Sequence, residues 1–175
     1  MPRSKEVNVK LLDEEFFKQY GLPKYATEES AGMDLRACIP DSIIIEPQSR
    51  VLIPTGLCID INDSNLAWVL IPKSGLGHKK GFVLGNLVGL IDSDYQQEVG
   101  VSGWNTSEVP LTFRRGDFVC QAVLVPVLRV VWSVVDELTR DVDRIGGWGS
   151  MPSVERCRKA TRRQRRTRYV VLGNT

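Results

Sequence analysis

The stretch VLIPTGLCIDINDSNLAWVLI, residues 51–71, contains three short apolar runs separated by turn-forming residues. The turn residues are PTG at 54–56 and ND at 62–63. Within 57–61, apolar side chains alternate with small or polar ones, as they do in a strand with one buried face. None of the runs reaches the ~12 residues over which a helical period is recognised. The stretch therefore predicts three β-strands in close succession.

The same pattern continues on both sides of this stretch. The density of short apolar runs predicts an all-β barrel or sandwich, with a short turn of helix only after Lys73. Pro126 interrupts the valine-rich stretch 123–135 and cannot donate a ladder hydrogen bond, so this strand is expected to be bent or at a sheet edge. Trp132 and the valines around it face either a partner subunit or the core of their own chain. The further apolar runs, with Gly, Pro, Asn and Asp between them, lie at 42–45, 82–84, 87–91, 99–101, 109–113 and 118–125.

The bulk properties indicate a small globular protein. The chain has 175 residues, which is the size of one domain with its own core. Its apolar segments are shorter than the ~18 residues of a membrane helix, so no membrane association is expected. Residues 1–6 lack the apolar region of a signal peptide, and the four cysteines have no zinc-binding spacing. We therefore expect a cytoplasmic protein without disulfides.

The net charge of +2 conceals an asymmetry along the chain. Residues 154–175 carry a net charge of +7, so the remaining residues carry −5. This break in composition predicts one domain over 1–152 and a basic tail over 153–175. A block of like charge is typical of a solvated, disordered tail. The alternative is that the arginines of the tail contact the phosphates of a nucleic acid.

Residues that suit nucleotide chemistry gather around GLIDSDY, residues 89–95. Asp92 is a carboxylate that can take a proton from water, and the ring of Tyr95 can stack on a sugar or a base. Asn86 offers a donor and an acceptor to a base edge. The turn around Ser74 contains glycines, so its backbone can approach a phosphate. Together these residues indicate nucleotide hydrolysis, although aspartates in such a run also serve as ordinary turn residues.

The order of these residues resembles that of the trimeric dUTP pyrophosphatase (dUTPase) family. The resemblance covers 9–150 and implies a jelly-roll-like β-barrel that assembles as a homotrimer, with active sites at the subunit interfaces. It also implies Mg²⁺-dependent hydrolysis of dUTP to dUMP and diphosphate, which limits uracil in DNA and supplies dUMP for dTMP synthesis. The five matching segments are AGMDLRA at 31–37, PKSG at 72–75, LGNLVGLIDSDY at 84–95, RGDFVCQ at 115–121 and DRIGGWGS at 143–150.

The third of these segments carries the expected recognition of deoxyuridine. By resemblance, Asp92 is the general base that activates water, and the Tyr95 ring packs against the deoxyribose. Asn86 reads the uracil edge, and Asp94 is structural. The backbone of the hairpin completes the recognition of uracil at Leu90, Ile91 and Gly100.

The second and fourth segments are implied to surround the triphosphate. Lys73 stands where most members of the family have arginine, and it keeps the charge but loses the bidentate fork. Ser74 contacts the oxygen near the α-phosphate and is the second expected catalytic residue, and the backbone of Gly75 approaches the phosphates. Gln121 donates to a phosphate oxygen.

The glycine-rich arm over 143–150 ends the expected domain. The resemblance implies that it folds over the nucleotide of a neighbouring subunit. Arg144 would meet the γ-phosphate, and Trp148 would stack on uracil. The arm differs from the family pattern because Trp148 replaces the usual phenylalanine and because one residue is missing between Arg144 and the glycine pair.

No direct metal ligand from the protein is expected. By resemblance, Mg²⁺ is held mainly by phosphates and water, and Asp34 acts at most through water. Alternatively, Asp34 forms an ion pair with Arg36 at a subunit contact. His78, the only histidine, is expected in a surface turn without a catalytic role.

Two other functions stay open at this level. A dCTP deaminase of the same fold would expel ammonia from cytosine with a carboxylate beside the base, and the run around Asp92 and the glycine-rich arm favour the pyrophosphatase. A non-catalytic dUTP-binding or signalling protein is suggested by the shortened arm and the basic tail.

Overall fold

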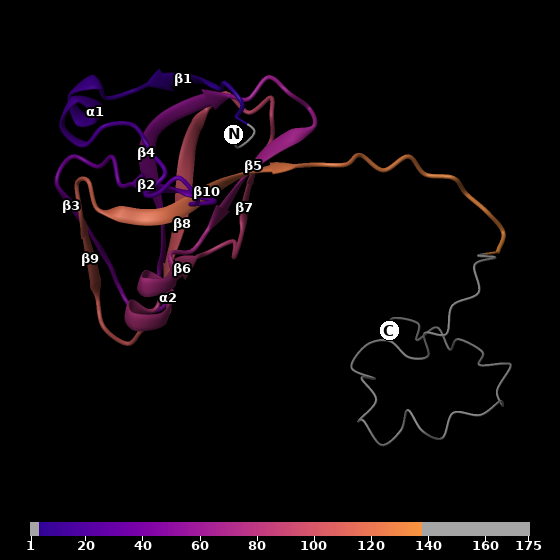
Figure 1. Ribbon diagram of the computed structural model, residues 1–175. Helices are drawn as coiled ribbons and strands as arrows, with labels where there is room; N and C mark the ends of the chain where they lie inside the picture. The colour runs from indigo at the N-terminus through magenta and orange to yellow at the C-terminus, as the bar shows by residue number, and fades with distance from the viewer. Residues whose placement is uncertain (1–3, 138–175) are drawn as a thin grey trace, which may run out of the picture. The chain divides into compact units, whose positions relative to one another are not determined.

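The computed structural model describes residues 4–137, which contain two helices and ten strands (Figure 1). The helices are α1 (Glu14–Tyr20) and α2 (Ser74–Lys80). The expected boundary near residue 152, the arm over 143–150 and the basic tail lie outside the described residues. The strands are β1 (Asn8–Leu11), β2 (Met33–Arg36), β3 (Ser42–Ile45), β4 (Arg50–Asp60), β5 (Leu66–Ile71), β6 (Phe82–Leu84), β7 (Gly89–Ile91), β8 (Glu98–Asn105), β9 (Leu111–Arg114) and β10 (Phe118–Pro126).

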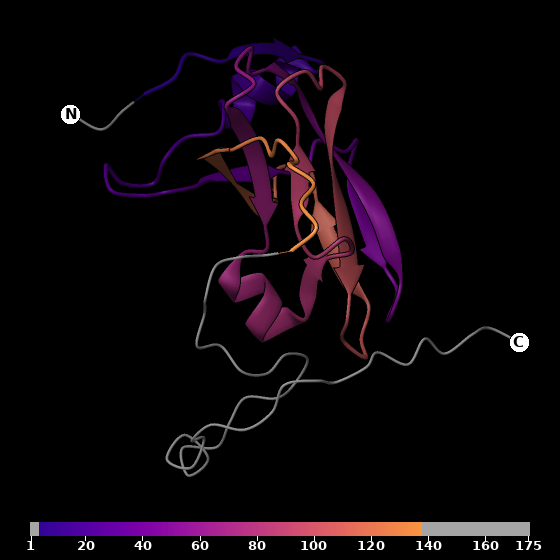
Figure 2. The ribbon, with the colours of Figure 1, turned by 90° about the vertical axis from the view of Figure 1, so that its right-hand side faces the viewer.

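The strands form two four-stranded sheets and one two-stranded sheet, and the strands pair in antiparallel fashion. The first sheet has the order β1-β4-β8-β6, the second has the order β2-β10-β5-β7, and β3 pairs with β9. Figures 1 and 2 show α1 and α2 at opposite ends of this β-structure. The all-β fold expected from the sequence is confirmed.

The sheets bury a shared apolar core. Along β8, half-buried and buried residues alternate, so Val99 and Val101 face inward while their neighbours face outward. The rings of Phe82 and Phe113 lie with their centroids 4.3 Å apart. Other large inward side chains are Phe16, Leu35, Ile45, Ile53, Ile61, Leu84 and Val119.

Strand β4 joins two of the predicted strands, so the turn expected at 54–56 is wrong. The register of β4 against β8 shifts between Pro54 and Cys58, which marks a β-bulge. Gly56 has φ +72° there, and a Cβ at this position would lie 2.8 Å from the Sγ of Cys38. The three residues therefore bend the strand without reversing it. Strand β4 pairs with β8 over residues 50–54 and again at Cys58, and with β1 over residues 57–60.

The valine-rich stretch follows the sequence expectation in part. Strand β10 lies between β2 and β5, but its pairing with β2 ends at Ala122, so Pro126 lies where only β5 is a neighbour. The chain after Pro126 is not in a strand up to residue 137. The side chain of Trp132 is 86% exposed.

The two helices are short. Helix α2 begins where a turn of helix was expected, and His78 lies exposed within it. Helix α1 was not expected, because seven residues are too few to establish a helical period. Neither helix has the length and apolar composition needed to cross a membrane, as far as the described residues extend.

Candidate active site

The register of the second sheet brings the first, second and fourth sequence segments together. Asp34 on β2 is paired with Gln121 on β10, which is paired with Ile71 at the end of β5. Lys73 follows two residues later, and its Nζ donates to Oδ1 of Asp34 at 2.6 Å. Both side chains of this ion pair are about three-quarters buried. A partly buried cation, a carboxylate and an amide thus share one end of the sheet.

Within the chain, Arg36 pairs with the backbone near β10 and not with Asp34. Its Nη1 donates to the carbonyl oxygen of Gly116 at 2.6 Å. Its guanidinium carbon lies 3.7 Å from the ring centroid of Phe118 and 5.6 Å from that of Tyr20. The carboxylate of Asp34 is thus matched by Lys73 instead.

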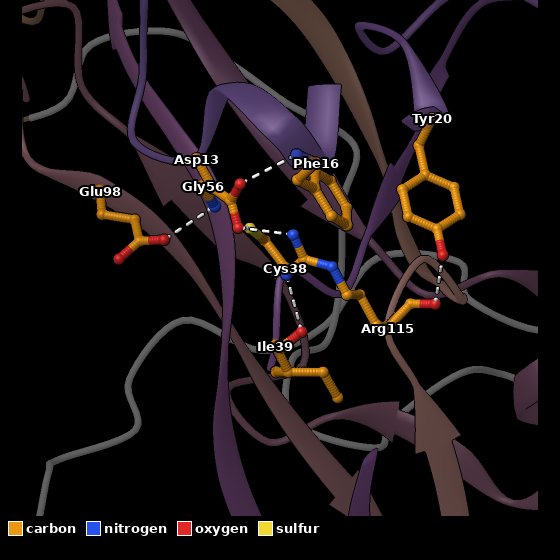
Figure 3. A network of polar contacts seen from close by, with 8 residues as sticks. All are labelled: Asp13, Phe16, Tyr20, Cys38, Ile39, Gly56, Glu98 and Arg115. Atoms are coloured by element: carbon orange, nitrogen blue, oxygen red, sulfur yellow. Dashed lines mark hydrogen bonds and ion pairs between the residues drawn. The ribbon is translucent and has the colours of Figure 1, made fainter. Parts of the chain in front are cut away.

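A polar network holds the turn that leads into β10 (Figure 3). Arg115 donates from Nη2 to Oδ2 of Asp13 at 2.6 Å and from Nη1 to the carbonyl oxygen of Ile39 at 2.9 Å. Asp13 also caps α1 by accepting from the Phe16 N–H at 2.9 Å. The Tyr20 hydroxyl donates to the carbonyl oxygen of Arg115 at 3.1 Å. This network fixes the start of the strand that carries Gln121.

The charges in this network shift one another's titration. The hydrogen bond from Arg115, followed by that from the Phe16 N–H, holds the pKa of Asp13 below its ordinary value. The same hydrogen bond raises the pKa of Arg115. Burial raises the pKa of the Cys38 thiol, which lies beside this pair. Both partners of the ion pair are therefore charged at neutral pH.

A buried thiol lies beneath the end of the sheet that carries Asp34 and Gln121. Cys120 is fully buried next to Gln121. Burial first, and the charge of Asp34 second, raise its pKa to about 12. Cys120 is thus a protonated core residue at neutral pH, and it does not act as a nucleophile.

The beginning of α2 adds the remaining residues of the second segment. Ser74 and Gly75 are exposed immediately after Lys73. A Cβ at Gly75 would meet no atom within 4 Å, so the space around this backbone is open. Within residues 4–137, no group of three or more His, Cys, Asp or Glu side chains is arranged to hold a metal ion.

The third segment forms a separate group of exposed residues around β7. Asn86 lies in the turn before β7, and Asp92 directly follows it. The Tyr95 N–H donates to the carbonyl oxygen of Asp92 at 3.1 Å, and the Tyr95 hydroxyl donates to that of Glu98 at 3.0 Å. Tyr95 is therefore held by hydrogen bonds from its backbone and from its hydroxyl, and it remains 39% exposed.

Strand β7 itself carries the residues expected to contact uracil through their backbone. Leu90 pairs with Val69 and is 61% exposed, and Ile91 is half-buried. Leu90 and Asp92 are both exposed. Gly100 lies on β8, which contacts β7.

Within one chain these two groups do not meet. Ile91 pairs with Trp68 near the start of β5, whereas Lys73 follows the end of β5. Asp92 is separated from this end by the four residue steps from Ala67 to Ile71 along β5, or about 13 Å. Strands β7 and β2 are also at opposite edges of their sheet, three strand spacings or about 14 Å apart.

The residues of the fifth segment, Arg144 and Trp148, lie outside the described residues. Two contacts near the site were missed by sequence reasoning. The pairing of Arg115 with Asp13 joins positions 102 residues apart, and no local pattern indicates it. The contact of Arg36 with Phe118 depends on the pairing of β2 with β10.

The chain is similar in sequence to known proteins along most of its length. A family model described as dUTPase matches residues 18–151. The deoxyuridine 5'-triphosphate nucleotidohydrolase of Legionella pneumophila (strain Paris) is 49% identical over 144 residues, which cover 82% of this chain and 95% of that protein. The protein of the same name from Acinetobacter baumannii (strain AYE) is 50% identical over 144 residues, covering 82% and 96%.

Solved structures show the same fold. A variant of the Staphylococcus bacteriophage 80alpha dUTPase with dUpNHpp has a TM-score of 0.70 at 21% identity, over 81% of this chain and 94% of that chain. A variant of the dUTPase from phage phi11 of S. aureus, described with a structural Mg(II) ion, has a TM-score of 0.63 at 22% identity, over 76% and 98%. Because the family model matches most of the chain and the bacterial relatives are about half identical along nearly their whole length, the chain belongs to the dUTPase family.

Proposed function

We propose that this chain hydrolyses dUTP to dUMP and diphosphate at sites assembled between the subunits of a homotrimer. The observation that carries the shared site is the separation of its two halves. Lys73 and Gln121 lie at one end of β5, and Asp92 lies at the other. Asp92 and Ser74 are both assigned to the α-phosphate, and within one chain they lie too far apart to meet there, so they must come from different copies of the chain. Symmetric homo-oligomers place such complementary surfaces against one another.

The group around β7 supplies the recognition of deoxyuridine and the general base. Asp92 takes the proton of the water that attacks the α-phosphorus, and its exposure leaves room for that water. Asn86 presents an acceptor and a donor to the N3–H and O4 edge of uracil. The Tyr95 ring packs against the deoxyribose, and the hydrogen bond from its hydroxyl to the Glu98 carbonyl fixes the orientation of the ring. Leu90, Ile91 and Gly100 contribute backbone groups.

The group at the end of β5 supplies positive charge and donors to the triphosphate. The Lys73 ammonium has three donors, so it can serve Asp34 and a phosphate oxygen together. Ser74 donates where negative charge develops near the α-phosphate. The Gly75 backbone and the Gln121 amide bind further oxygens. Arg144 and Trp148 complete the proposed site from the arm of a neighbouring subunit.

The donor set fits a magnesium ion that retains most of its water. Asp34 offers a single carboxylate, a hard ligand, and it lies next to a lysine that attracts phosphates. Mg²⁺ commonly binds through one or two carboxylates together with substrate phosphates. Asp34 would hold the ion through water, and the bound ion would neutralise part of the triphosphate charge. The proposed location of the enzyme is the cytoplasm.

The test is the release of diphosphate from dUTP, measured beside dCTP, dTTP and UTP, with Mg²⁺ and with excess chelator. Release from dUTP alone, dependent on Mg²⁺ and accompanied by the mass of a trimer, is expected. Ammonia released from dCTP would support the deaminase instead. Tight binding of dUTP by a folded trimer without turnover would support the non-catalytic binding protein.

A further inference from the structure

Phe118 is the first residue of β10 and lies near Lys73, one of the residues proposed to bind the triphosphate. It is not among the site residues expected from the sequence. In a regular strand, Phe118 and Gln121 would face opposite sides. The pairing of β10 with β2 shifts by one residue between Phe118 and Cys120, which is a β-bulge. Val119 and Cys120 are consequently both buried. The bulge turns Phe118 to the outer face, where Gln121 also lies.

The Phe118 ring contacts two cations. The guanidinium carbon of Arg36 lies 3.7 Å from the ring centroid, and Nζ of Lys73 lies 5.0 Å from it. Both distances are within the ~6 Å over which a cation is attracted to an aromatic face. Arg36 is itself anchored by its hydrogen bond to Gly116. The ring therefore contacts Arg36, which is fixed by a hydrogen bond, and Lys73, which is proposed to bind a phosphate.

Lys73 needs such a support more than an arginine would. Its ammonium is a point charge on a flexible four-carbon stem and lacks the planar fork of a guanidinium. Asp34 holds it at 2.6 Å, but Asp34 is also the carboxylate proposed for the metal. An aromatic face attracts the ammonium without a second carboxylate, so the donors of Lys73 that Asp34 does not use stay available to the phosphates.

We propose that Phe118 is a positioning residue, whose ring holds the Lys73 ammonium toward the triphosphate. The inference rests on the proposed function, in which Lys73 contacts a phosphate. A cation–π contact at an exposed site corresponds to about a twofold to fivefold change in an equilibrium constant. Since the contact is present before and during the reaction, its loss should raise KM and leave kcat unchanged.

The experiment compares two variants of the full chain in dUTP hydrolysis. Phe118→Leu keeps an apolar side chain and removes the aromatic face, whereas Phe118→Tyr keeps the face. We expect KM for dUTP to rise about twofold to fivefold in Phe118→Leu, with kcat within a factor of about two. Phe118→Tyr should match the wild type. Thermal unfolding and trimer mass, measured in parallel, identify any loss that comes from misfolding.

The same substitution in a Lys73→Met background separates the inference from the proposal beneath it. Phe118→Leu should add no further change in KM there, because the ammonium is already absent. An equal rise in both backgrounds, or a Phe118→Tyr variant as impaired as Phe118→Leu, would overturn the positioning role. An unchanged KM in Phe118→Leu, beside a raised KM in Lys73→Met, would also overturn it and leave the phosphate role of Lys73 intact. An unchanged KM in Lys73→Met would remove that proposed role and the inference with it.

Discussion

Two inactive variants, Asp92→Asn and Ser74→Ala, should restore activity to each other when their chains are mixed within one trimer. Asp92→Asn removes the proposed base, and Ser74→Ala removes a donor to the developing charge, so each alone should lose about 10²-fold or more in kcat. In the structure, Asp92 lies near the start of β5 and Ser74 lies beyond its end. The proposed site takes these residues from different subunits.

The expected recovery follows from counting. In an equal mixture, half of the subunits carry an intact Asp92, and the other half carry an intact Ser74. A site that takes one residue from each of two subunits is intact in about one quarter of cases. The recovery should therefore reach about 25% of the wild-type rate per site and should be greatest at equal proportions. A site built within one chain has no recovery at any proportion.

The assay is diphosphate release from dUTP after the two variants are unfolded together and refolded. The control mixes the same variants after separate refolding, so that trimers do not exchange subunits. Light scattering verifies that both preparations are trimers. Activity that stays at the level of the separate variants, in a trimer of verified mixed composition, would refute the shared site and place Asp92 and Ser74 in one subunit.

Three further outcomes are expected. Asp13→Asn keeps the cap of α1 but loses the ion pair with Arg115. Because the pKa of Asp13 is lowered in the folded state, the variant should be less stable than the wild type to chemical unfolding above about pH 3.8. The difference in stability should vanish as the pH falls through the lowered pKa. Gly116→Ala should lower the unfolding free energy by about 1–3 kcal/mol, because φ there is +86° and a Cβ would overlap the Tyr20 ring. An unchanged free energy of unfolding, measured by chemical denaturation, would exclude the overlap. Excess chelator should abolish diphosphate release and added Mg²⁺ should restore it, and full activity in chelator would contradict the metal requirement.

Strands with a clear pattern and clear ends were predictable from the sequence. The runs at 42–45, 66–71 and 82–84 coincide with β3, β5 and β6, because turn residues bound them on both sides. The turn at 54–56 was wrongly predicted, since proline and glycine suit a bulge as well as a reversal. Helix α1 has a capping aspartate, Asp13, and a closing glycine, Gly21, and these terminal signals could have identified it without any periodicity.

In the candidate site too, local sequence patterns were predictable and features set by strand pairing were not. Its motif residues are recognisable one by one because each lies in a short local pattern, and the pairing of strands then brings Asp34, Lys73 and Gln121 together. The local sequence pattern does not show on which face of the sheet a side chain lies when the strand contains a bulge. An alternating reading of FVCQ places Phe118 opposite Gln121, and only the bulge, a property of pairing with β2, reverses that placement. Residues that tune a site through such an irregularity are therefore hidden from sequence reasoning even when the site itself is not. Under the positioning role proposed for Phe118, the bulge would also account for a lysine where the resemblance implies an arginine, because the aromatic face it exposes would supply an orientation that the lysine side chain does not have by itself.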